Sequence, residues 1–184
     1  MILKFVGDIH GQYQHLINHA NKNLELPTIQ VGDFGFGFVD VPELPKNVSM
    51  IRGNHDDPII AKNHSQWIPD GSLINDVLYV GGGYSIDHGE RTIGVELFEY
   101  EELSYTDLNE IIDKAIINKP KVIVSHECPP IAISSYNAPS RTANALQAIY
   151  DNAPPKLWVF GHWHRSLIKK LTIHCLFVLI STKL

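Results

Sequence analysis

Several features that would assign a protein to a specialised class are scarce in this sequence. Cysteine occurs only at Cys128 and Cys175, so there is no disulfide framework and a reducing compartment is expected. Apolar runs are short, and the one at 176–180 is far below the length of a membrane span. The first residues lack the apolar stretch and cleavage site of a secretion signal. We therefore expect a cytoplasmic protein with no membrane partner.

Positive charge is also scarce. The formal net charge is -5 at pH 7, and the chain holds only four arginines, which are Arg52, Arg91, Arg141 and Arg165. Without a broad basic surface, general affinity for nucleic acid is disfavoured, and nucleic acid is expected only as a substrate. A phosphate-bearing substrate would have to be attracted locally, by metal ions and a few arginines.

The composition is otherwise that of an ordinary globular protein. The 184 residues, 44% of them hydrophobic and 19% charged, fit one domain spanning 1–184. Apolar runs predict strands at 2–6 and 28–31, and apolar residues recur at helical spacing over 12–23. A strand, a helix and a strand with short links predict a right-handed parallel crossover and an α/β fold.

Further elements follow the same two patterns. Strands are expected at 48–51, 121–124 and 157–160, helical segments at 58–62, 108–116 and 141–150, a hairpin within 73–80, and one or two strands within 167–181. Ser104 or Thr106 would cap the second long helix, and Lys119-Pro120 would end it.

Five turns that each close an apolar run carry polar side chains. They are Gly7-Asp8-Ile9-His10-Gly11, Gly32-Asp33, Gly53-Asn54-His55-Asp56, Ser125-His126-Glu127 and Gly161-His162-Trp163-His164. Strand ends gather at the edge where open α/β sheets bind ligands. Carboxylate, imidazole and amide oxygen suit divalent ions such as manganese, iron or zinc. Asp33 is the candidate to bridge two ions, because it falls between ligand groups able to hold one ion each.

Each turn taken alone has a simpler interpretation. An Asp-x-His at a strand end is usually a cap or turn pair, and a lone Gly-Asn-His is most often a turn. Gly-His-x-His can place two ligands on one face, because alternate residues of a strand point the same way. All five turns together, in this order, favour a metal site.

The joint pattern resembles the calcineurin-like metallophosphoesterase superfamily, including its phage and bacterial members, and it extends from residue 7 to residue 164. The resemblance implies an α/β fold of the two-sheet α/β/β/α sandwich type, with two divalent ions at one edge. It also implies the ligands: Asp8, His10, Asp33 and His164 for the first ion, and Asp33, Asn54, His126 and His162 for the second. His55 would be the general acid.

A phosphoesterase mechanism follows from this chemistry. Two ions about 3.5–4 Å apart would share Asp33 and a water, whose pKa they lower, and the resulting hydroxide would attack phosphorus. Manganese is the favoured ion, with iron, zinc or nickel as alternatives. His55 would protonate the leaving group, with Asp56 or Asp57 favouring its charged form.

Two arginines are candidates for binding substrate phosphate. Arg52, in an Arg-Gly-Asn-His sequence like that of protein phosphatases, could form a fork onto phosphate oxygens, or it could form a surface salt bridge. Arg91 could reach the phosphate, with Asp87 ordering its loop, or the segment could be a plain hairpin.

The sequence departs from the family pattern at two places. Where protein phosphatases carry Asp-Arg after the bridging aspartate, this chain has a phenylalanine- and glycine-rich loop at 34–38. Phe34 and its neighbours could stack on a substrate ring, or they could cover the core. The chain also ends soon after His164, which leaves the edge of the second sheet undecided.

Three functions remain at this point. A phosphomonoesterase acting on phosphoproteins or small molecules is favoured, because the arginine of the Arg52-Gly53-Asn54-His55 sequence adds positive charge, from which monoester dianions gain most. A phosphodiesterase acting on nucleotides or nucleic acid is the alternative that the aromatic loop favours. A non-catalytic metal-binding scaffold is disfavoured, because His55 and every expected ligand are present.

Overall fold

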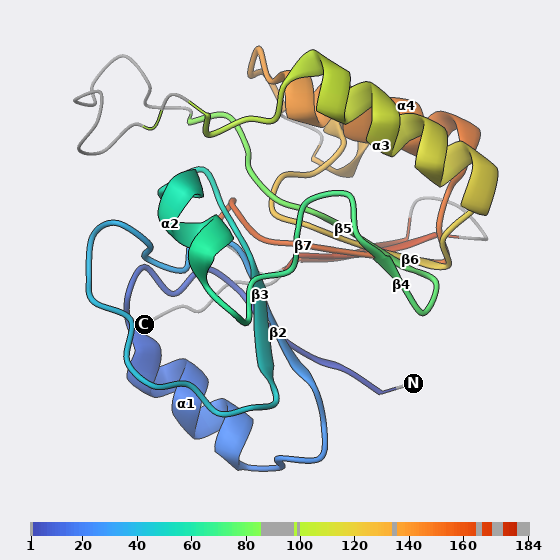
Figure 1. Ribbon diagram of the computed structural model, residues 1–184. Coiled ribbons are helices and arrows are strands. Elements are labelled where there is room, and N and C mark those ends of the chain that lie inside the picture. Colours follow the sequence, from blue (N-terminus) through green and yellow to red (C-terminus); the bar gives the residue numbers. More distant parts are fainter. Residues whose placement is uncertain are drawn as a thin grey trace.

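The computed structural model describes residues 2–85, 98, 100–133, 136–164, 167–170 and 175–179. Two β-sheets pack against each other, and helices cover the outer face of each sheet (Figure 1). This arrangement confirms the predicted α/β/β/α sandwich. In the described part of the chain, no helix combines the length and the apolar character needed to cross a membrane.

The smaller sheet is wholly parallel and is built from the N-terminal third of the chain. Its strands are β1 (Lys4–Val6), β2 (Thr28–Val31) and β3 (Val48–Ile51), in that spatial order. The helices α1 (Tyr13–Asn21) and α2 (Pro58–Asn63) pack on its outer face. The crossover from β1 through α1 to β2 is the one predicted from the change in hydrophobic period.

The larger sheet has six strands in the order β4-β5-β6-β7-β9-β8. The strands are β4 (Leu73–Ile74), β5 (Val77–Val80), β6 (Val122–Ser125), β7 (Leu157–Phe160), β8 (Leu167–Lys170) and β9 (Leu176–Leu179). Strands β5, β6, β7 and β9 run parallel, whereas β4 and β8 are antiparallel edges. The segment after His164 therefore forms two strands of this sheet, and β8 is the sheet edge that the sequence left undecided.

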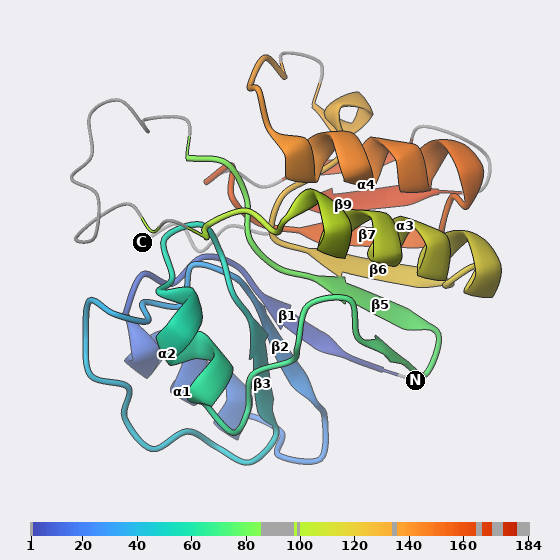
Figure 2. The same cartoon turned by 45° about the horizontal axis from the view of Figure 1, so that its top comes forward.

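Two long helices, α3 (Tyr105–Asn118) and α4 (Arg141–Asn152), lie side by side over the larger sheet (Figure 2). Ser104 caps α3 by accepting a hydrogen bond from the Asp107 N–H, and Lys119 ends it in the left-handed conformation with a φ of 48°. A 3₁₀ turn, η2 (Pro130–Ala132), lies near the start of α4. Ser104, and not Thr106, is therefore the cap, because its hydroxyl reaches an N–H that the first turn leaves unpaired.

The alternation of side chains along the strands divides the core into three layers. On β5, Val77 and Tyr79 belong to the cluster between the two sheets, whereas Leu78 and Val80 belong to the cluster under α3 and α4. A third cluster lies between the smaller sheet and its helices. Because successive strand residues face opposite ways, the central strands β5, β6 and β7 each contribute side chains to two layers, which holds their carboxyl ends in place.

Removal of buried volume at the centre of the larger sheet tests this layering. Ile123 on β6 is fully buried, whereas Ile117 on α3 is 77% exposed. We expect Ile123→Ala to lower the free energy of unfolding by about 2–5 kcal/mol, and Ile117→Ala to change it by less than about 0.5 kcal/mol. Urea denaturation measures both, and equal midpoints for the two variants would contradict the layering.

Candidate metal centre

Backbone hydrogen bonds join the predicted turns directly to one another. The N–H groups of Ile9 and His10 both donate to the carbonyl of Asp33, at 3.1 and 2.9 Å. Within the larger sheet, the Gly161 N–H after β7 donates to the His126 carbonyl after β6 at 3.1 Å. The buried amide of Gln30 donates to the carbonyls that follow β1 and β2. Hydrogen bonds thus join the turns that carry the sequence motifs, as expected for strand ends that gather at one edge.

The ligand set predicted for the first ion is assembled. One ligand atom from each of Asp8, His10, Asp33 and His164 lies within 4.8 Å of all the others. The two carboxylates are buried, and the two imidazoles are exposed and stacked, with ring centroids 5.0 Å apart. Two oxygens and two nitrogens suit a divalent transition metal, and the exposed imidazoles leave the site open to a substrate.

Two residues predicted for the second ion, His126 and Asn54, lie close to Asp33. The Nε2 atom of His126 lies 3.3 Å from Asp33 Oδ1 and 2.9 Å from Asn54 Oδ1. Its Nδ1 lies 2.9 Å from the Val31 carbonyl, to which an Nδ1–H can donate. Burial lowers the pKa of His126 well below its usual value. The imidazole is therefore neutral, with its Nε2 lone pair available for an ion.

His162 is also predicted for the second ion. It lies beside His126 but is less closely packed against the other predicted ligands. Its ring centroid is 5.1 Å from that of His126, and its Nε2 lies 3.5 Å from Glu127 Oε2. Within the described residues, the first set is the one group of three or more carboxylate, imidazole or thiolate ligands that is compact enough to hold an ion. Nε2 of His162 is buried and makes no hydrogen bond to any residue that the structure describes, so this nitrogen is available to an ion.

Glu127 supports the site, although the sequence assigned it no function. It is 1% exposed, and it accepts hydrogen bonds from the Cys128 N–H, the Tyr136 hydroxyl and Trp163 Nε1 at 2.8, 3.2 and 3.3 Å. Its only sequence signal is its place directly after His126. A carboxylate that faces a ligand histidine fixes the orientation of the ring. Trp163 packs against the core under α3 and α4.

Two residues distant in sequence orient the Asn54 amide. Asn54 Nδ2 donates to Ser85 Oγ at 3.0 Å, and Ser85 Oγ donates to Glu101 Oε2 at 2.6 Å. All three side chains are buried. Because the amide nitrogen is bound on this side, the amide oxygen faces His126 and Asp33. The separations of 31 and 16 residues gave the sequence analysis no reason to connect Ser85 and Glu101 with Asn54.

The backbone at the site is held in conformations that non-glycine residues rarely adopt. The φ angles of His10, Asp33, His162 and His164 are 43°, 54°, 72° and 45°. Such conformations cost of order 1–3 kcal/mol each and concentrate at functional sites. A Cβ at Gly161 would collide with the Asp8 carboxylate, so this glycine permits the close approach of β7 to β1.

The electrostatics of this cluster favour a cation. Burial raises the pKa of Asp8 to about 7, although the carboxylate accepts a hydrogen bond from the His162 N–H at 3.1 Å. A buried carboxylate is costly unless it is paired with positive charge, and a divalent ion supplies that charge. The residues present therefore fit the ions that the motif implies.

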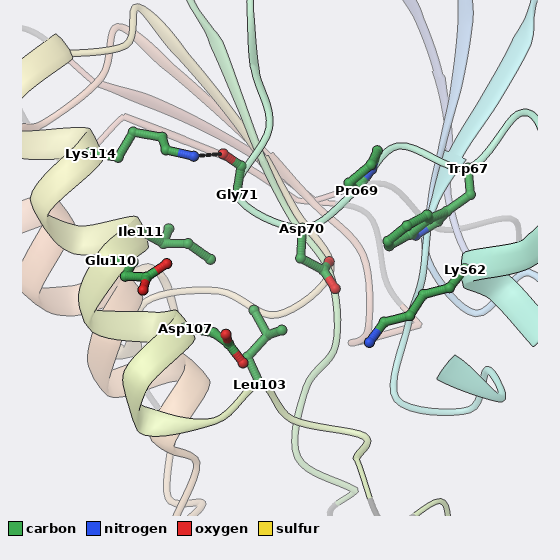
Figure 3. Close-up of a pocket in the computed structure, with 10 residues that line it drawn as sticks. All are labelled: Lys62, Trp67, Pro69, Asp70, Gly71, Leu103, Asp107, Glu110, Ile111 and Lys114. Carbon is green, nitrogen blue, oxygen red and sulfur yellow. Dashed lines mark hydrogen bonds between the residues drawn. The ribbon is translucent and has the colours of Figure 1, made fainter. Parts of the chain in front are cut away.

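Arg52 does not have the role predicted for it. Its side chain is 2% exposed, and Nε donates to Asp70 Oδ2 at 2.9 Å. Nη1 donates to the carbonyls of Tyr100 and Glu101 at 3.0 and 2.9 Å. The guanidinium therefore fastens the loop before α3 and forms neither a phosphate fork nor a surface salt bridge. Its partner Asp70 lines a separate pocket of about 210 Å³ between Trp67 and α3 (Figure 3).

Asp56 also differs from its prediction as a partner of the general acid. Its buried carboxylate accepts hydrogen bonds from the N–H groups of Phe34, Gly35, Phe36 and Gly53, at 3.0, 2.7, 3.0 and 2.7 Å. Burial raises the pKa of this carboxyl, and the four backbone donors oppose that effect. Asp56 therefore ties the loop after β2 to the loop after β3.

The prediction that Phe34 contacts substrate is wrong. Phe34 is fully buried, with its ring centroid 4.9 Å from that of Tyr13 and 4.7 Å from that of Phe36. It belongs to the core under α1, which was the alternative interpretation. Arg91 and Asp87 lie outside the described residues.

His55 stands at the edge of the first ligand set. Its backbone N–H donates to Asp33 Oδ1 at 3.0 Å, and its ring meets the His10 ring edge to face, with centroids 5.3 Å apart. A pocket of about 260 Å³ beside these rings is lined by His10, Gly35, Phe38 and His55. A proton donor at this position borders both the candidate ion site and the space for a leaving group.

Comparison with known proteins identifies the family of the chain. Residues 1–166 match the family model described as calcineurin-like phosphoesterase. The chain belongs to the calcineurin-like phosphoesterase family. No curated protein matches it. One similar solved structure is a protein serine/threonine phosphatase from Saccharomyces cerevisiae with similarity to human phosphatase PP5, at 15% identity and a TM-score of 0.44, over 96% of this chain and 66% of that one.

The neighbouring aspartates 56 and 57 form a matched pair for testing the anchor. Asp57 caps α2 by accepting from the N–H groups of Ile59 and Ile60, and asparagine performs that task equally well. We expect Asp56→Asn to lower the free energy of unfolding of the metal-free protein by about 3 kcal/mol, because one amide oxygen cannot accept from four donors. Asp57→Asn should change it by less than about 0.5 kcal/mol.

Urea denaturation in a chelating buffer measures both variants. An Asp56→Asn protein as stable as Asp57→Asn would contradict the anchoring role.

Proposed function

We propose that the protein is a dinuclear metal-dependent phosphoesterase that hydrolyses phosphate esters, with monoesters as the favoured substrates. The observation that carries the proposal is the convergence of Asp8, His10, Asp33 and His164 within 4.8 Å, next to His55 and an open pocket. Membership of the calcineurin-like phosphoesterase family supports it.

Asp33 is the residue that would be shared by two ions. Its Oδ2 lies 3.8 Å from His10 Nε2, within the first ligand set, whereas Oδ1 lies 3.3 Å from His126 Nε2, within the second. Each carboxylate oxygen thus faces a different group of ligands. Asn54, His126 and His162 would complete the second set.

The chain itself would orient the substrate and supply a proton. When bound, a pair of divalent ions supplies positive charge for the phosphoryl oxygens and lowers the pKa of a water. His55 would donate its proton to the ester oxygen as the bond to phosphorus breaks. The exposed His10 and His164 mark the side from which the ester enters.

Manganese is the ion we propose, with iron, zinc or nickel as alternatives, because the donor set mixes carboxylate, imidazole and amide oxygen. The partner is the phosphate ester itself. A cytoplasmic location stays a prediction, based on the use of only two cysteines, both buried.

Two substrate classes remain as candidates. The monoester argument from Arg52 no longer holds, since that side chain is buried in other contacts. A monoester dianion still gains most from two ions and a charged His55. Diesters are the second candidate, favoured by the aromatic Phe38 in the pocket. Turnover of p-nitrophenyl phosphate against bis(p-nitrophenyl) phosphate, with manganese, separates them, and no turnover of either ester would refute the proposal.

The bridging role of Asp33 predicts the ion content of a variant. Wild type should hold two manganese ions per chain, whereas Asp33→Asn should bind them at least about a hundredfold more weakly while keeping its circular dichroism spectrum. Asp113→Asn, on the exposed face of α3, should hold two ions. Elemental analysis after gel filtration reports the stoichiometry. Two retained ions in Asp33→Asn would show that another group bridges them.

The role of His55 predicts a dependence on the leaving group. His55→Asn should lower kcat by about 10²–10⁴-fold for alkyl phosphates, whose alkoxide needs a proton. The loss for p-nitrophenyl phosphate should be much smaller, because its leaving group is stable as an anion. Ion content should stay that of wild type. Equal losses for both esters would rule out the acid role.

A further inference from the structure

We propose that the pocket beside His10 and His55 is a subsite for a planar aromatic leaving group, with Phe38 as its stacking platform. The inference rests on the proposed function and names its substrate class as aromatic phosphate esters. The sequence predicted substrate contact for Phe34, at the start of the loop at 34–38. In the structure the ring that lines the pocket is that of Phe38, at the end of this loop.

The loop places its three phenylalanines in different environments. Phe34 and Phe36 are fully buried and pack against each other, whereas Phe38 is 45% exposed and lines the pocket. Two rings therefore anchor the loop in the core, and the third lies at the surface in the pocket that His10 and His55 also line. An exposed aromatic ring in a pocket is a binding feature that the core does not require.

Several contacts hold the loop around Phe38 in place before any ligand binds. The Phe38 N–H donates to the Gly35 carbonyl at 3.2 Å, and the Asp57 N–H donates to the Phe36 carbonyl at 2.9 Å. Gly37 has a φ of 90°, and a Cβ there would press on Asp57. Phe98 supports the Phe38 ring edge to face, at 5.7 Å between centroids. A fixed platform binds a flat ligand with little loss of entropy.

The size and lining of the pocket suit one aromatic ring next to a phosphoryl group. Its volume is about 260 Å³, and an apolar cavity of about 150 Å³ is enough to hold benzene. Among the residues that the structure describes, none with an acidic side chain lines the pocket, so an anionic phosphate can approach. His10 belongs both to this lining and to the first ligand set, so a ring in the pocket lies next to phosphorus. His55 also lines the pocket, where it would lie next to the ester oxygen that joins the ring to phosphorus.

Binding of non-hydrolysable phosphonates to the manganese-loaded protein tests the subsite without turnover. We expect phenylphosphonate to bind about tenfold more tightly than methylphosphonate, and more tightly than cyclohexylphosphonate, whose ring is not flat. In Phe38→Ala this preference should fall by about five- to tenfold, with methylphosphonate affinity unchanged. Phe38→Tyr should keep the preference, and so should Val39→Ala, at the next exposed apolar residue.

Isothermal calorimetry gives the affinities. Equal binding of phenyl- and methylphosphonate, or of phenyl- and cyclohexylphosphonate, would overturn the subsite, as would a preference that survives in Phe38→Ala. Turnover of an aliphatic ester such as glycerol 2-phosphate distinguishes failure of the subsite from failure of the proposed function. If that ester is hydrolysed while phenylphosphonate shows no preference, the subsite fails alone; if no ester is hydrolysed, the proposed function fails.

Discussion

The structure depends on the burial of two carboxylates, Asp8 and Asp33, where the parallel strands of both sheets end. Each is almost wholly removed from water, and burial raises the pKa of Asp8 to about 7. Nearby charge of opposite sign is what makes a buried carboxylate stable. Because Asp33 presents one oxygen to each ligand group, a pair of cations at this edge would supply the positive charge that the buried carboxylates require.

The loops that surround these carboxylates are held by polar side chains that the proposed chemistry does not use directly. Asp56 accepts four backbone N–H groups, Glu127 faces His162, and Ser85 connects Asn54 to Glu101. Each carries charge or hydrogen bonds into the interior, where an unsatisfied partner would be costly. Their combined effect is to hold ligand residues in backbone conformations that are otherwise rare.

Much of this arrangement could be predicted, because the relevant signals are local. Hydrophobic period located the strands and helices, and the glycine-flanked turns located the ligands of the first set. Roles that depend on the direction of a side chain could not be predicted. Arg52, Asp56 and Phe34 all lie beside ligand residues in sequence, yet each points into the interior. Ser85 and Glu101 meet Asn54 only through the folding of the larger sheet onto the smaller one.

The central claim is that two ions share the Asp33 carboxylate. A crystal grown with manganese and measured at its absorption edge tests this claim most directly. We expect this crystal to show two anomalous peaks about 3.5–4 Å apart. One should lie among Asp8, His10 and His164, the other beside Asn54 and His126, with Asp33 between them. A single peak, or a pair without Asp33 as a ligand, would contradict it.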